Sequence, residues 1–153
     1  MDNLTLEHLS AYLPYGVELA FIVRDEVRYI DKITGISDIG DYDDIKIKLG
    51  YNDSEHIWMF KPILRPLSDL TKEIEHNGEK IVPIDYINGE FSLEIPDKIE
   101  LQNWVKNRSI HFVLAEWVGI EDLYKLFKLL FKWHFDVFGL IDKGLAIDIN
   151  ILK

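Results

Sequence analysis

The chain has 153 residues, 48% of them hydrophobic and 12% aromatic, with 27 acidic residues against 17 basic ones and no cysteine. This length corresponds to one domain, and the apolar content is enough for a buried core, which excludes a disordered chain. The absence of cysteine excludes disulfides, thiolate catalysis and cysteine-ligated zinc or iron–sulfur sites.

The net charge of −10 is unevenly distributed along the chain. Residues 1–100 hold 21 acids and 10 bases, whereas residues 101–153 hold 6 and 7. An acidic surface repels phosphate backbones, so autonomous nucleic-acid binding is disfavoured. No apolar run reaches the roughly 18 residues of a membrane span, and the first residues lack the basic and apolar regions of a signal peptide. These features predict a cytoplasmic protein that does not bind a membrane.

The first 65 residues favour β-structure after one short helix. Thr5 is a suitable N-cap for that helix, which Pro14 and Gly16 would end. Apolar alternation then predicts strands over 17–24, 27–36, 45–49 and 56–64, with a loop over 37–44.

Three expectations follow for these strands. Phe21 and Val23 are expected to be buried on one face of the first strand, and Pro62 places the last strand at an edge or makes its end irregular. Short antiparallel strands must curl to bury their apolar face, so we expect an SH3-like barrel or a strongly twisted meander.

Helical signals follow from Ser68 onward. Ser68 is a suitable N-cap for a helix to about Glu75, with Asn77-Gly78 as its stop. Residues 80–95 permit two interpretations, a hairpin turning at Asn88-Gly89 or a short helix.

The strongest helical pattern spans 120–138. Its polar residues fall on one narrow stripe, which is typical of a central helix or of a subunit interface, so a homo-oligomer is one alternative. Lys125, Lys128 and Lys132 share one face, while Phe127 and Phe131 are expected to be nearly fully buried. Residues 145–151 then alternate like a strand.

The predicted organisation is a single α+β domain over 1–153. Its sub-lobes are 1–65, mainly β, and 66–153, mainly α with one long central helix.

Metal binding is disfavoured. The five histidines lack ligand spacing such as H-E-x-x-H. A site assembled across the fold from His111, Glu116 and His134 is the alternative to a structural, hydrogen-bonded His134. The acidic residues Asp38, Asp41, Asp43 and Asp44 lack the spacing and the bidentate glutamate of a calcium loop, which favours a solvated loop. We therefore expect no metal and no cofactor.

Catalytic motifs are equally scarce. The sequence contains no G-x-S-x-G nucleophile elbow and no phosphate-binding glycine loop. With 27 carboxylates, a chance pair carries no information. No catalytic residue is assigned, which favours a protein that is not an enzyme.

A few residues are candidates for partner binding. Trp58, in a predicted edge strand, is expected to face a groove, because tryptophan is common at binding hot spots. Pro62 and Pro66 stiffen the following segment. A rigid connector is the favoured interpretation, and a recognition surface using Lys61 and Arg65 is the alternative. Lys125, Lys128 and Lys132 are the candidates for a partner or for phosphates.

Three segments resemble a known group of proteins. They are TLEHLSAYLPYG (5–16), KPILRPLSDLTKEI (61–74) and WHFDVFGLIDKGLAIDIN (133–150), about 44 of the 153 residues. They are similar to short uncharacterised proteins encoded in prophages and mobile elements of gut anaerobic bacteria. The resemblance implies an accessory protein of phage or mobile DNA, and it implies no catalytic residue.

Three functions are therefore weighed. The preferred one is a non-enzymatic accessory protein that acts as an interaction module and binds another protein. The alternatives are a nucleic-acid-associated protein using the three lysines, and a hydrolase or metalloenzyme built from dispersed histidines and carboxylates.

Overall fold

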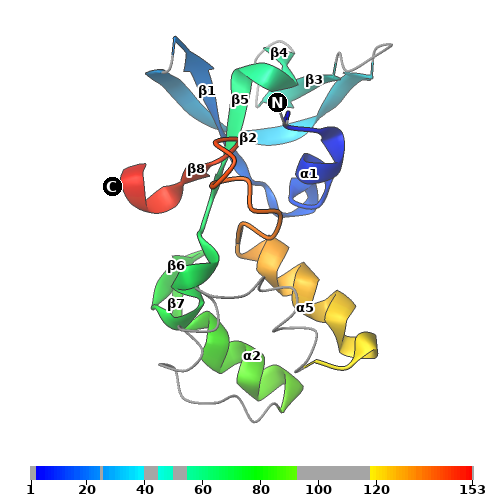
Figure 1. The fold of residues 1–153 in the computed structure, drawn as a ribbon, viewed down its shortest axis with the longest axis vertical. Helices are drawn as coiled ribbons and strands as arrows, with labels where there is room; N and C mark the ends of the chain where they lie inside the picture. Colours follow the sequence, from blue (N-terminus) through cyan, green and yellow to red (C-terminus); the bar gives the residue numbers. More distant parts are fainter. Residues whose placement is uncertain (1–2, 25, 40–44, 50–54, 93–117, 153) are drawn as a thin grey trace. The chain divides into compact units, whose positions relative to one another are not determined.

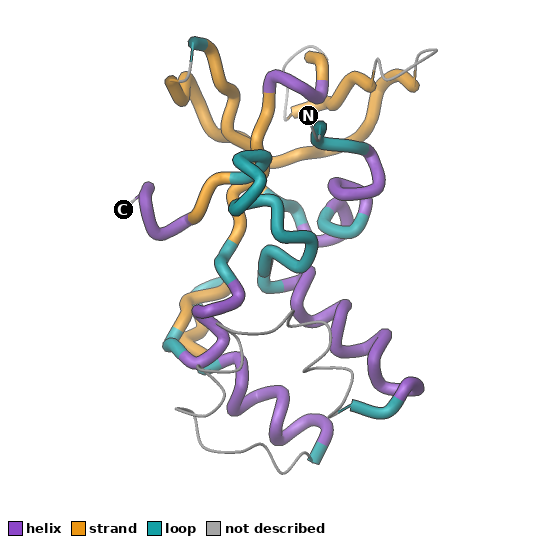
Figure 2. Tube along the Cα trace, in the orientation of Figure 1, coloured by secondary structure: helices purple, strands orange, loops and turns teal. Residues whose placement is uncertain are grey.

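The computed structural model describes residues 3–24, 26–39, 45–49, 55–92 and 118–152. The chain divides into two compact units. We call them the sheet unit, Met1–Arg65 with Phe138–Lys153, and the helical unit, Pro66–Val137. The chain is therefore a mixed α+β protein in which the C-terminal segment returns to the sheet (Figures 1 and 2).

The sheet unit is built on one sheet with the order β4-β3-β2-β1-β5-β8. Its strands are β1 (Glu18–Val23), β2 (Glu26–Ile39), β3 (Ile45–Leu49), β4 (Glu55–His56), β5 (Phe60–Leu64) and β8 (Ile147–Asp148). The first five of these are antiparallel to their neighbours, and β8 joins β5 in parallel through Ile63↔Ile147 and Leu64↔Asp148. A short 3-10 helix, Ile149–Leu152, follows β8.

The expected SH3-like barrel is wrong. A closed barrel needs its first and last strands to pair, whereas among the described strands β4 pairs only with β3 and β8 only with β5. The physical reason is the C-terminal segment. Because β8 occupies the free edge of β5, that edge cannot close onto β3 or β4.

The predicted first strand is present, but its burial differs from the expectation. Leu19 and Ala20 are fully buried, whereas Phe21 and Val23 are only half-buried. The pairing of β1 with β2 shifts register between Phe21 and Ile22, and such a bulge changes which side chains face the core. The Phe21 ring instead stacks on Tyr29, with centroids 4.9 Å apart.

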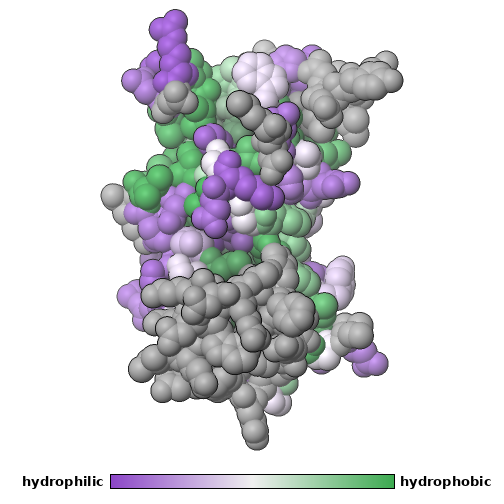
Figure 3. All heavy atoms as spheres, viewed as in Figure 1, coloured by the Kyte–Doolittle hydropathy of each residue, from purple (hydrophilic) through white to green (hydrophobic). Residues whose placement is uncertain are grey.

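The tip of the β1–β2 hairpin is hydrophilic, and hydrophobic residues follow directly below it (Figure 3). Arg24 and Glu26 are exposed at this tip, and Glu26 pairs with Arg28 at 3.3 Å. Apolar side chains farther along β2 remain partly open to solvent, with Val27 at 42% and Ile30 at 43% exposure.

The single strand expected over 56–64 is two strands. A 3-10 helix, Ile57–Met59, separates β4 from β5. The prediction that Pro62 lies at an edge is wrong, because β5 lies between β1 and β8. Pro62 has no amide hydrogen to donate, and its pairing fits this: it faces Leu19 of β1, and pairing with β8 begins only at Ile63.

The N-terminal helix α1 (Leu6–Ser10) begins as predicted. Thr5 caps it in a capping box, in which the His8 ring accepts the Thr5 amide hydrogen through Nδ1 at 3.2 Å. After the 3-10 helix Leu13–Tyr15, Gly16 takes a left-handed conformation with φ 64° and turns the chain towards β1. The Phe138 ring packs edge-on against His8 at 5.4 Å.

The described part of the helical unit contains the helices α2 (Pro83–Phe91) and α5 (Ile120–Lys132), a short 3-10 helix (Leu67–Thr71) and a small hairpin of β6 (Ile74–His76) and β7 (Glu79–Ile81). The buried residues of its core come from the 3-10 helix, β6, α2, α5 and the segments directly before and after α5. They are Leu70, Ile74, Ile87, Val118, Leu126, Leu130, Trp133, Phe135 and Val137.

Two Asn-Gly pairs have opposite outcomes. At Asn77-Gly78 both residues have positive φ, 53° and 81°, as a type I′ turn requires, and they join β6 to β7. The helix predicted from Ser68 to Glu75 is therefore wrong and is a 3-10 turn followed by a strand. Asn88-Gly89 lies inside α2, where Pro83 stands at the first turn and Ile84 and Ile87 are buried. Residues 83–91 are thus the short helix.

The expected long central helix over 120–138 is wrong as well. Helix α5 ends at Lys132, and His134 then takes a positive φ of 58°. The chain leaves the helix there because Phe135, at 0% exposure, enters the core from an irregular segment. Leu126 and Leu130 are the buried positions of α5, and Phe127 and Phe131 are only partly buried, contrary to expectation.

Candidate functional site

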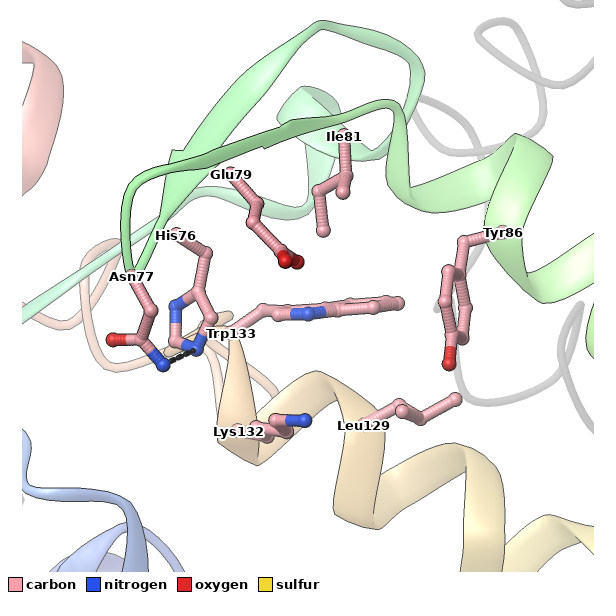
Figure 4. A pocket seen from close by; sticks show the side chains of 8 residues that line it. All are labelled: His76, Asn77, Glu79, Ile81, Tyr86, Leu129, Lys132 and Trp133. Carbon is pink, nitrogen blue, oxygen red and sulfur yellow. Dashed lines mark hydrogen bonds between the residues drawn. The ribbon is translucent and has the colours of Figure 1, made fainter.

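A hollow of about 140 Å³ opens on the helical unit, and we call it the indole pocket (Figure 4). The β6–β7 hairpin, helix α2 and the end of α5 supply its lining. The lining residues are His76, Asn77, Glu79, Ile81, Tyr86, Leu129, Lys132 and Trp133.

Trp133 forms a fixed part of the pocket lining. It is the C-cap of α5, its amide donates to the Leu129 carbonyl at 3.0 Å, and its side chain is only 3% exposed. The Tyr86 ring stands perpendicular to the indole, with centroids 5.3 Å apart. Edge-to-face contacts of this kind are favourable, so these two rings form a rigid aromatic corner.

Two opposite charges border the indole. The Glu79 carboxylate and the Lys132 ammonium lie on opposite sides of the Trp133 ring as drawn in Figure 4. Both residues are exposed. Within the described part of the chain, neither side chain forms an ion pair or a hydrogen bond. The pocket therefore presents one anion and one cation that are exposed to solvent and have no partner among the described residues.

Two other lysines of the helical unit form ion pairs. Lys80 binds Glu73 at 3.0 Å, and this hydrogen bond and charge raise the pKa of Lys80 above its ordinary value. Lys125 binds Asp122 at 2.7 Å, which raises the pKa of Lys125 in the same way. Glu79 and Lys132 have no such partner among the described residues, so both are available to a ligand.

The histidines of this unit have neighbours of their own. The His76 Nε2 atom lies 3.1 Å from the side-chain amide nitrogen of Asn77 and accepts a hydrogen bond from it. The His134 ring lies edge-on to His76, with centroids 6.0 Å apart. Among the described residues, no three metal-ligating side chains come together. Of the three residues weighed for a metal, His111 and Glu116 lie outside the described residues, as does most of the 37–44 loop.

Trp58 is the most prominent aromatic residue of the sheet unit. Its side chain is 72% exposed and stacks on His56 with centroids 5.9 Å apart. It lies in the 3-10 helix Ile57–Met59, between two residues that are buried, Ile57 at 4% and Phe60 at 2% exposure. The backbone is thus anchored on both sides of an outward-facing indole.

The other predicted binding residues are divided between the units. Lys61, on β5, and Arg65 are half-buried in the sheet unit with Trp58. Lys125, Lys128 and Lys132 are exposed on α5 in the helical unit, as predicted for one helix face. Lys132 lines the indole pocket, whereas Lys125 and Lys128 do not.

Sequence reasoning did not find the indole pocket. His76, Glu79, Tyr86 and Trp133 belong to no binding or catalytic motif in the sequence. A signal was present at Asn77-Gly78, since a type I′ turn there pairs His76 with Glu79 across the hairpin. Nothing in the sequence could indicate that this hairpin lies beside the end of α5.

Comparison of the chain with protein-family models, with curated proteins and with solved structures gave no match. Among the described residues, no helix is both long and apolar enough to cross a membrane.

Proposed function

We propose that the chain is a non-enzymatic interaction module that binds another protein through the surface around Trp58. The observation that supports this most directly is the 72% exposure of the Trp58 side chain. An indole left in water forgoes the stabilisation that burial provides, and tryptophan is enriched among the residues that dominate binding energy.

The local structure favours Trp58 as a contact residue because it is held in place. Ile57 and Phe60 are buried on either side, and the Phe60 amide donates to the Ile57 carbonyl to close the 3-10 turn. A side chain held in its bound position loses little entropy on association. Half-buried Lys61 follows closely on β5 and can contribute a polar contact at the rim.

A protein is a better partner than a nucleic acid for this chain. The net charge of −10 repels phosphates. Of the three lysines on α5, Lys125 is bound to Asp122 at 2.7 Å, and the Lys128 ammonium lies 4.6 Å from the centroid of the Tyr124 ring. The same acidic charge favours encounter with a basic partner.

The biological setting is a separate part of the proposal. The resemblance of residues 5–16, 61–74 and 133–150 to prophage and mobile-element proteins supports an accessory protein of phage or mobile DNA. Expression of the gene after induction of the host's mobile elements tests this setting independently of binding.

The binding proposal is tested by affinity capture with the full chain as bait, using extracts of the organism that carries the gene. We expect one protein to be retained by the wild type and lost with Trp58→Ala. The control is Tyr124→Ala, because Tyr124 is similarly exposed at 70% but lies in the other unit.

A gel shift with double- and single-stranded DNA at low salt tests the alternative function, nucleic-acid binding. Retention of DNA that Lys125→Ala and Lys128→Ala abolish would favour nucleic-acid binding. Capture that is unaffected by Trp58→Ala would remove Trp58 from the proposal.

A further inference from the structure

The indole pocket carries an inference that does not depend on the Trp58 surface. Its volume is about 140 Å³. For comparison, a cavity of roughly 150 Å³ engineered into the core of another protein holds one benzene molecule. This size holds about six non-hydrogen atoms, as many as benzene has, so it fits the side chain of a small ligand whose charged groups lie at the pocket's exposed rim, and it is too small for a nucleotide or a folded segment of another protein.

The charges of the pocket specify the chemistry of such a ligand. Glu79 and Lys132 are both unpaired within the described residues and do not pair with each other. With the Trp133 ring between them (Figure 4), a ligand satisfies both charges only if its cationic group lies on the Glu79 side and its anionic group on the Lys132 side. That requirement describes a zwitterion.

The uncharged walls specify the remainder of the ligand. Tyr86 and Leu129 line the end of the pocket away from His76 and Asn77, as Figure 4 shows, and Ile81 lies above the indole. A ligand side chain placed at that end contacts carbon atoms and the Tyr86 ring. An apolar side chain therefore gains burial there, whereas a charged one loses its hydration.

We propose that the indole pocket binds a free α-amino acid with an apolar side chain, its ammonium at Glu79 and its carboxylate at Lys132. Leucine is the probe for the test. The proposal assigns no reaction to the site and makes it a small-molecule binding site on the helical unit.

The test uses the ¹⁵N-labelled full chain and follows the indole N–H resonances during titration with leucine. The Trp133 resonance should shift, while that of Trp58, identified with Trp58→Ala, should not. Leucinamide lacks the carboxylate and N-acetylleucine lacks the ammonium. Each should bind about two- to fivefold more weakly than leucine, because an exposed charge pair is lost.

Substitutions at Lys132 and Glu79 test which charged group of the ligand each residue binds. In Lys132→Met, leucine should bind no better than leucinamide, and in Glu79→Gln it should bind no better than N-acetylleucine. Both residues are exposed, so the variants should fold, and Lys128→Ala on the same helix should retain wild-type affinity. The proposal is overturned if millimolar leucine leaves the Trp133 resonance unchanged. Equal binding of the three ligands, or wild-type affinity in both variants, overturns it as well.

Discussion

Leu130 and Phe131 are adjacent on α5 but differ in their contribution to stability. Leu130 is 1% exposed within the core of the helical unit, while Phe131 is only partly buried and stacks on Phe127 at 6.2 Å. We expect Leu130→Ala to lower the free energy of unfolding by ~2–5 kcal/mol, and Phe131→Ala to lower it by less. Urea unfolding of both variants measures the difference.

Lys128 provides the control for this comparison. Its side chain is exposed over the Tyr124 ring, and exposed substitutions change stability by less than about 0.5 kcal/mol. A loss from Lys128→Ala equal to that from Leu130→Ala would show that the buried face of α5 is assigned incorrectly.

Asp69 is a buried carboxylate in the 3-10 helix Leu67–Thr71. Its side chain is 3% exposed and accepts a hydrogen bond from the Lys72 ammonium at 2.5 Å. Hydrogen bonds to charged groups contribute ~1.5–3 kcal/mol. Asp69→Asn keeps an oxygen acceptor and removes only the charge, so it should lower the free energy of unfolding by ~1 kcal/mol, the difference between a charged and a neutral hydrogen bond, in chemical denaturation. Glu73→Gln, which changes only an exposed ion pair, should have a much smaller effect.

At the scale of elements, the two Asn-Gly pairs give a direct test of which one forms the turn. A Cβ added at Gly89 meets no atom within 4 Å, and the residue lies in the interior of α2. Gly89→Ala should raise the free energy of unfolding by ~0.4–1 kcal/mol, because alanine favours the helix. Gly78→Ala should lower it, because φ of +81° disfavours any residue with a Cβ.

In thermal unfolding, Tm should rise for Gly89→Ala and fall for Gly78→Ala if Asn77-Gly78 forms the turn. If residues 80–95 were instead a hairpin turning at Asn88-Gly89, Gly89→Ala would be the destabilising variant.

The cap of α1 is a second prediction at this scale. The side chains of Thr5 and His8 each accept a hydrogen bond from the other residue's backbone amide. Thr5→Ala should therefore lower the free energy of unfolding by about 1 kcal/mol, within a range of ~0.5–2. His8→Gln should retain most of the stability, because glutamine also completes a capping box. Chemical denaturation of both variants checks this, with Ser10→Ala as an exposed control. A smaller loss for Thr5→Ala than for His8→Gln would contradict the capping role.

At the scale of the whole molecule, the sheet unit depends on residues from both ends of the chain. Strand β8 pairs with Ile63 and Leu64 of β5, both of which are buried. A chain truncated after Lys143 loses β8, so these side chains become accessible to water. Each 1 kcal/mol lost lowers Tm by roughly 2–4 °C for a chain of about this length, and we expect a decrease of at least that amount in calorimetry.

The substitution Ile151→Ala is the matched control for the truncation. Ile151 follows β8 and is 73% exposed, so its removal should leave Tm nearly unchanged. A truncated chain with the wild-type Tm would show that β8 is not needed for the stability of the sheet unit.

Features that depend on interactions between neighbouring residues could be predicted from the sequence. The cap at Thr5, the strand at 45–49 and the start of β1 near residue 17 all follow from local hydrogen bonding and from period-two burial. The lysine face of α5 was predictable for the same reason, because helical geometry brings residues 125, 128 and 132 to one side.

The spatial neighbours of each element, by contrast, follow from tertiary packing and could not be predicted from the sequence. Local signals could not show that β8 covers the edge of β5, which leaves the sheet open, or that Phe135 ends α5 by entering the core. The two Asn-Gly pairs are locally alike, and they differ because Ile84 and Ile87 of α2 are buried. The indole pocket depends on the same contacts, since Glu79, Tyr86 and Lys132 come from three different elements. Burial between segments distant in sequence is a non-local energy, and no local sequence pattern encodes it.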